Sequence, residues 1–86
     1  MRSTIEDWKN GWLGLELALS AEEIDKLIER LQLIKVDSDQ HFHISSDYKG
    51  SGGLGEITFC RKNADLVDNF FISSQALAAG SETELK

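Results

Sequence analysis

The stretch "HFHISSDYKGSGGLGEITFCR", residues 41–61, contains two runs of alternating apolar and polar residues on either side of a glycine-rich connection. Successive side chains of a β-strand point to opposite faces, so each run is typical of a strand with one buried face. The connection is rich in glycine, as hairpin loops are. The stretch therefore predicts strands at about residues 40–46 and 54–61, paired antiparallel.

One register of this hairpin matches apolar residues with apolar residues. It pairs Ile44 with Ile57 and Phe42 with Phe59. A slip by one residue would place each apolar side chain opposite a polar one, so the register is strongly specified. On the polar face the same register pairs His41 with Cys60, His43 with Thr58, and Ser45 with Glu56.

The hairpin is preceded by a helix and, before that, by another strand. Ser20 and Glu23 in "SAEE" form a capping box, which predicts a helix over about residues 21–34. Its apolar stripe consists of Ile24, Leu27, Ile28, Leu31 and Ile34. Leucines alternate with other residues over 13–19, which predicts a half-buried strand, and Trp12 is expected to close the core at its start. Trp8 is either a core residue or an exposed interface anchor.

The chain after the hairpin gives a weaker signal. The run "NADLVDNFFISS" suits either a short helix capped by Asn63 or an edge strand at "NFFIS", and we favour the strand. Whether residues 64–79 are strand or helix stays open, and residues 80–86 are expected to be a disordered tail. The predicted fold class is α+β, with one main helix packed on a small, mostly antiparallel sheet in a single domain, residues 1–79.

Size, composition and charge exclude several classes of protein. The chain has 86 residues, 41% of them hydrophobic, which suits one small folded domain. One cysteine cannot form an internal disulfide, no apolar run is long enough to span a membrane, and no signal peptide is visible, so we expect a cytoplasmic protein. The net charge of −6 argues against nucleic-acid binding.

The connection "KGSGGLG" does not match a phosphate-binding loop. In a P-loop, lysine follows the glycines and a helix begins there, whereas here Lys49 precedes them and a strand follows. Glycine supplies the positive φ values that tight connections need. The stretch is therefore predicted to be a hairpin turn.

The polar face of the hairpin raises the question of a metal or a thiol site. His41, His43 and Cys60 would suit zinc, with water or Asp39 as the fourth ligand. Structural zinc sites normally show four clear ligands, and a thiol nucleophile also needs an oxyanion hole and an orienting group. We therefore expect no bound metal, no cofactor and no enzymatic activity. A small metal-binding or thiol-dependent protein remains an alternative, as does a structural or regulatory subunit of a larger complex whose apolar tail docks on its partner.

Two segments, "LSAEEIDKLIERLQ" and "HFHISSDYKGSGGLGEITF", together resemble one family of bacterial polymorphic-toxin immunity proteins. The family has a His-x-His strand followed by a loop that bears an aromatic residue and glycines. The family usually carries tryptophan where Tyr48 stands here, and its glycines follow more closely. The matching positions are His41, His43, Ser46, Gly50 and Leu54.

The resemblance implies a small α+β protein that binds a toxin and neutralises it by occlusion. Such a protein needs no catalytic residues and no cofactor, and its acidic charge would suit a basic toxin such as a nuclease. The partner is then a cognate protein toxin rather than nucleic acid or a membrane. The residues expected to contact it are His41, His43, Asp47, Tyr48 and Glu56.

Overall fold

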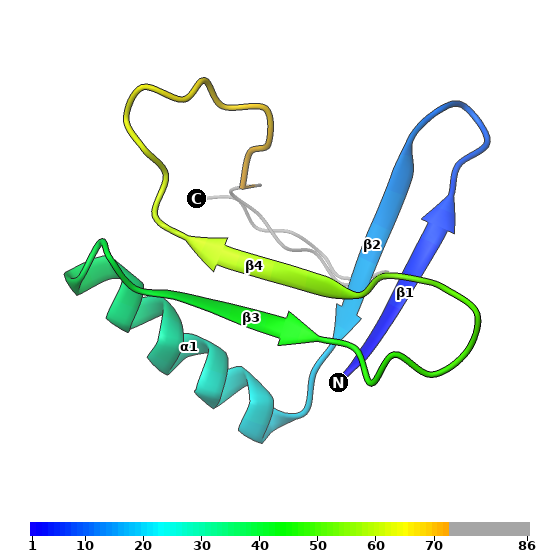
Figure 1. The fold of residues 1–86 in the computed structure, drawn as a ribbon, viewed down its shortest axis with the longest axis horizontal. Coiled ribbons are helices and arrows are strands. Elements are labelled where there is room, and N and C mark those ends of the chain that lie inside the picture. Colours follow the sequence, from blue (N-terminus) through cyan, green and yellow to red (C-terminus); the bar gives the residue numbers. More distant parts are fainter. Residues whose placement is uncertain (73–86) are drawn as a thin grey trace, which may run out of the picture.

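The computed structural model describes residues 1–72 and has an α+β fold, as predicted. Two antiparallel two-stranded sheets, β1–β2 and β3–β4, are joined by one helix. Figure 1 shows α1 running along β3, with the β1–β2 hairpin standing at the end of the β3–β4 hairpin that carries the long loop. The elements in chain order are β1 (Arg2–Asp7), β2 (Leu13–Ala18), α1 (Ala21–Val36), β3 (His41–Ser45) and β4 (Glu56–Cys60).

The first strand, β1, is an element that the sequence did not predict. Its residues "RSTIED" include only one apolar side chain, Ile5, so no alternation marks them as a strand. β1 forms by pairing with β2, with Ile5 opposite Leu15. This pairing makes a separate small sheet, whereas the sequence suggested a single sheet.

The helix begins at the predicted residue and ends two residues later than expected. The Ser20 hydroxyl oxygen accepts from the Glu23 N–H at 3.2 Å, and Glu23 Oε1 accepts from the Ser20 N–H at 3.0 Å, so the capping box is confirmed. Of the apolar stripe, Ile34 is buried, with 7% of its surface exposed, and Leu27 is half-buried. Ile34 is the only buried residue in the described part of the chain.

The register of the β3–β4 hairpin is confirmed at every predicted pair. Ile44 lies opposite Ile57 and Phe42 opposite Phe59, and all four side chains are half-buried. The rings of Phe42 and Phe59 stack, with centroids 4.9 Å apart and planes 10° from parallel. Offset stacking of this kind adds to the free energy gained from burying the rings.

Several residues expected in the core are exposed. Trp12 is 70% exposed, so the prediction that it closes the core was wrong. In the helix stripe, Ile24, Ile28 and Leu31 also remain exposed. A 3.6-residue period predicts which side of a helix is apolar, but that side is buried only where another element covers it.

The chain after β4 is neither helix nor strand as far as residue 72, so the edge strand predicted at "NFFIS" was wrong over 69–72. The Leu66 N–H donates to the Asn63 carbonyl at 3.0 Å in a turn, and Phe70 and Ile72 are 90% and 100% exposed. No partner strand lies beside this segment in the described structure, and an aromatic run forms a strand only when it is paired. The predictions for residues 73–79 and for the tail 80–86 lie outside the described residues.

Over residues 1–72 we find no helix whose length and apolar character would let it cross a bilayer.

Candidate functional site

The polar face of the β3–β4 hairpin carries a hydrogen-bonded cluster of three side chains. His43 Nδ1 lies 2.6 Å from Glu56 Oε1 and 2.9 Å from Thr58 Oγ1. The Thr58 hydroxyl in turn donates to Glu56 Oε1 at 3.1 Å. The register creates this cluster, because His43 and Thr58 are opposite each other and Glu56 lies two residues from Thr58 on the same face.

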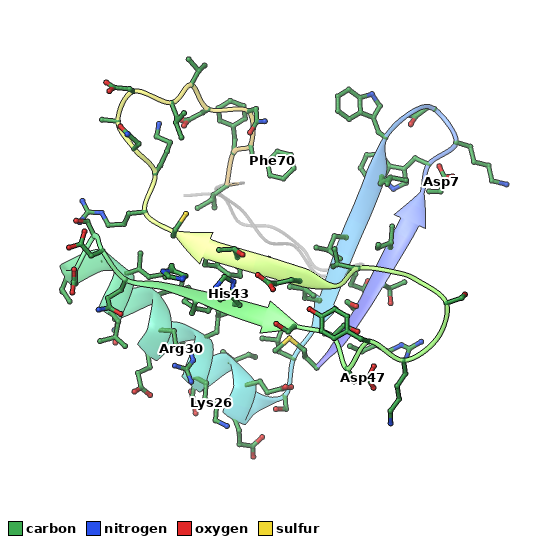
Figure 2. All side chains as sticks on the ribbon, in the orientation of Figure 1. Asp7, Lys26, Arg30, His43, Asp47 and Phe70 are labelled. Carbon is green, nitrogen blue, oxygen red and sulfur yellow. The ribbon has the colours of Figure 1, made fainter. Side chains whose placement is uncertain are left out.

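This geometry requires a proton on His43 Nδ1. A carboxylate can only accept hydrogen bonds, and the Thr58 hydroxyl already gives its hydrogen to Glu56. The Nδ1–H group must therefore donate, shared between the Glu56 carboxylate and the Thr58 oxygen. The cluster holds the imidazole in one orientation on the hairpin surface (Figure 2).

His41 lies next to this cluster. Its ring meets the ring of His43 edge to face, with centroids 5.0 Å apart and planes at 80°. Cys60 lies opposite His41 in the register and is a free, exposed thiol. The structure therefore brings His41, His43 and Glu56 together on one face, as predicted.

The same residues bear on the alternatives of a metal site or a thiol enzyme. In the part of the chain that the structure describes, no three or more His, Cys, Asp or Glu side chains are grouped as ligands of one metal ion. Both hydrogen-bond partners of His43 contact the same ring nitrogen. In a relay of nucleophile, base and acid, by contrast, the imidazole uses its two nitrogens separately.

The loop after β3 displays Tyr48. Tyr48 has φ of 58°, and its N–H donates to Ser46 Oγ at 2.9 Å. Its ring lies against the backbone of Gly55, where an added Cβ would come within 3.1 Å of the Tyr48 ring. The neighbouring Asp47 accepts from the Lys49 N–H at 3.1 Å. These contacts hold the tyrosine in place while leaving it 67% exposed.

The glycines allow the loop to close into a concave turn. Gly50 has φ of 90° and Gly53 has φ of 140°, values that other residues rarely adopt. The loop encloses a hollow of about 310 Å³, lined by its own residues. The predicted hairpin turn is confirmed, and β4 follows it rather than a helix.

Asp47 and Glu56 also line a cavity that the sequence did not reveal. It has a volume of about 370 Å³ and lies between the start of β1 and the loop end of the β3–β4 hairpin. Arg2 lines the same cavity, so the lining includes one cationic and two acidic side chains. β1 itself lacked a sequence signal, and no pattern therefore placed Arg2 here. The full lining is Met1, Arg2, Ser3, Leu17, Ile44, Ser45, Ser46, Asp47, Leu54, Gly55, Glu56 and Ile57.

One carboxyl group near the site has a strongly shifted pKa. The Met1 amino group lies 2.7 Å from Glu23 Oε2, and the Ser20 N–H donates to the other oxygen. These contacts, with the amino group as the main cause, lower the pKa of Glu23 from 4.5 to about 2. Met1 thus connects the start of β1 to α1.

The site is a polar, hydrogen-bonded sheet face beside a loop that displays an exposed aromatic ring. Comparison of the chain with protein families, with curated proteins and with solved structures finds no match.

Proposed function

We propose that this chain is an immunity protein that binds a bacterial toxin and neutralises it by occlusion. The contact surface is the polar face of the β3–β4 hairpin together with the loop 47–53. The partner is a cognate protein toxin, and a basic toxin would complement the net charge of −6. The protein acts by binding in the cytoplasm, without catalysis and without a cofactor.

The observation that carries this proposal is the ordered display of polar groups beside Tyr48. The hydrogen bonds among His43, Glu56 and Thr58 fix their orientation before any partner arrives. Tyr48 stands on the adjoining loop, largely exposed and held by its backbone contact with Ser46. Preorganised polar groups and exposed tyrosines are features of protein-binding surfaces, since little entropy is lost on association.

The resemblance to the immunity family supports the same proposal from the sequence. His41 and His43, on which the resemblance rests, lie on the face that carries the cluster. Glu56 belongs to the cluster, and Asp47 and Tyr48 follow β3 in the adjoining loop, so the five proposed contact residues lie along one hairpin and its loop.

The experiment is growth rescue in bacteria that express the toxin domain encoded next to this gene. Coexpression of the intact chain should restore growth. Changing both Tyr48→Ala and Glu56→Gln should reduce the rescue and weaken binding of the purified proteins, because it removes the displayed ring and the charge of the cluster. Circular dichroism should show that the double variant keeps its fold.

The matched control is the double variant Trp12→Ala and Glu29→Gln, which removes one exposed aromatic ring and one carboxylate away from the proposed surface. It should rescue growth as well as the unmodified chain. If the Tyr48 and Glu56 variant rescues fully, the interface lies elsewhere. If the intact chain neither rescues growth nor binds the neighbouring toxin domain, the immunity proposal is wrong.

A second candidate function, that of a subunit docked on a larger protein, is favoured by the segment after β4. Val67, Phe70 and Ile72 are each at least 90% exposed in the described structure. A run of exposed apolar side chains is unusual on a monomer and is typical of docking segments. Changing Phe70 and Phe71 to serine should abolish copurification with such a partner and should leave toxin rescue unchanged.

A further inference from the structure

A groove between α1 and β3 has a chemistry different from that of the rest of this acidic chain. Its volume is about 420 Å³. Leu27, Phe42 and Ile44 are among the apolar side chains that are half-buried along it. Figure 2 labels Lys26 and Arg30 on α1, and both line this groove. The groove therefore combines apolar surface with two cationic side chains.

The positive charge of this groove is not balanced from within. Lys26 and Arg30 stand four residues apart, which places them on the same side of the helix. Neither forms a salt bridge with any residue from 1 to 72. A third cation in the groove, the Met1 amino group, is neutralised by Glu23. Two cations without a salt bridge to the described residues thus line a groove in a chain whose net charge is −6.

The edge of β3 away from β4 has backbone groups available for pairing. The Ser46 N–H donates to the Gly55 carbonyl at 2.8 Å, one step beyond the Ser45–Glu56 pair. In an antiparallel ladder, hydrogen-bonded pairs alternate with non-bonded pairs. The N–H and C=O groups that point away from β4 are therefore those of His41, His43 and Ser45.

These outward groups have no backbone partner in the described structure. β3 pairs only with β4, and no other backbone hydrogen bond reaches it there. His43 and Ser45 also line the groove, so the free edge and the two cations belong to one surface. An unpaired strand edge is a template for an added strand.

We propose that the groove between α1 and β3 binds an extended acidic peptide segment of a partner protein as an additional strand on β3. Backbone hydrogen bonds to His43 and Ser45 align the segment. Its alternating apolar side chains cover Phe42 and Ile44, and its carboxylates pair with the cations of α1. Strand addition of this kind gains affinity from the backbone and specificity from alternate side chains.

The charge of the groove argues for a foreign peptide rather than a second copy of the chain. A twofold pairing of β3 with β3 would bring the Lys26 and Arg30 side chains of both copies to one interface. Like charges at an interface oppose association. This proposal concerns a surface other than the Tyr48 loop and does not require the partner to be a toxin.

The test is binding of a fluorescent eight-residue peptide of alternating valine and glutamate to the intact chain, measured by anisotropy. The double variant Lys26→Gln and Arg30→Gln should weaken binding on the order of fivefold or more. The matched control, Lys9→Gln and Lys35→Gln, removes the same charge outside the groove and should bind like the unmodified chain. A peptide of alternating valine and lysine should not bind.

A second measurement separates strand addition from charge attraction alone. Methylating the peptide nitrogens on one edge of the strand removes its donors to β3 and should reduce affinity about tenfold. Methylating those on the other edge should have little effect. NMR amide shifts should move at His43 and Ser45.

Three results would overturn the proposal. The first is equal loss of affinity in the two double variants, and the second is insensitivity to methylation on both edges. The third is a chain that sediments as a dimer through β3 and does not bind the acidic peptide, which would show that a second copy occupies the edge. None of these results depends on toxin rescue, so the two proposals can fail separately.

Discussion

The two hairpins have the same antiparallel pairing, but their apolar faces differ in exposure. In β3–β4, Phe42 and Ile57 are half-buried, and α1 runs along β3. In β1–β2, Leu13 and Leu15 lie on one face with Ile5, and all three are exposed. Alternation therefore predicts a strand, whereas burial of the strand's apolar face depends on whether another element reaches it.

The connection between α1 and β3 explains why only one hairpin has a neighbouring helix. The Gln40 N–H donates to the Asp37 carbonyl at 3.2 Å, and Asp37 Oδ1 accepts from the Asp39 N–H at 3.0 Å. This tight turn sends β3 back along the helix that precedes it. β1 and β2, by contrast, are joined directly to each other, and Figure 1 shows no described helix running along them.

The largest expected effect tests the difference in burial directly. Replacing Ile34, the buried residue of α1, with alanine should lower the free energy of unfolding by about 2–5 kcal/mol, because it removes packed atoms and leaves a cavity. Replacing Leu15, on the exposed face of β2, should cost about 1 kcal/mol or less. Urea unfolding measures both. Equal losses would mean that the β1–β2 face is covered in solution.

The next effect concerns the loop that distinguishes the β3–β4 hairpin from the short turn of β1–β2. Gly53 has φ of 140°, which is accessible essentially only to glycine, so Gly53→Ala should cost about 1–3 kcal/mol. Gly52 lacks a positive φ and has open space around its Cα, so Gly52→Ala is the matched control and should be nearly neutral. Thermal unfolding compares the two. Similar melting temperatures would show that the loop relaxes freely around both positions.

The sequence predicted well those elements whose signals are local. The capping box located the start of α1, and the apolar match of Ile44 with Ile57 determined a register that also placed His43 beside Thr58. The pairing of residues on the polar face of the candidate site could therefore be predicted from the sequence. The local rules were sufficient because each depends on residues within one helix turn or one hairpin.

Contacts between distant elements could not be predicted in this way. β1 carries a single apolar residue, so its pattern indicated neither the strand nor that Arg2 lines the same cavity as Asp47. The Trp8 indole lies against Gly14: a Cβ built on Gly14 would be 3.0 Å from the nearest indole atoms. No local sequence pattern predicts this contact. Trp12 was misplaced because periodicity does not show which surface remains uncovered.

A smaller effect is expected at the start of the helix that accompanies only one hairpin. Ser20→Ala removes the acceptor for the Glu23 N–H and should cost about 1 kcal/mol. Ser51→Ala, in the exposed loop, removes a hydroxyl that makes no hydrogen bond in the described structure, so it should be neutral. Helicity by circular dichroism and the urea midpoint provide the readouts. A neutral Ser20→Ala would mean that packing along β3 alone holds the first turn.

The smallest effect tests the contact that ties the β1–β2 hairpin to α1, the ion pair between Met1 and Glu23. The folded pKa of Glu23 is about 2, below its usual 4.5. As the pH falls, the Glu23 carboxylate is therefore protonated at a higher pH in the unfolded chain than in the folded one. The stabilisation is therefore complete above about pH 4.5 and is lost progressively as the pH falls toward 2.

Carbon-13 NMR titration should find the low pKa of Glu23 in the intact chain. Acetylating the amino terminus should raise it toward the usual value, since the amino group is its main cause. Glu23→Gln should flatten the dependence of the urea midpoint on pH between 4.5 and 2, whereas Glu29→Gln should not. A Glu23 pKa unchanged by acetylation would show that this pair does not join β1 to α1, the helix that runs along the other hairpin.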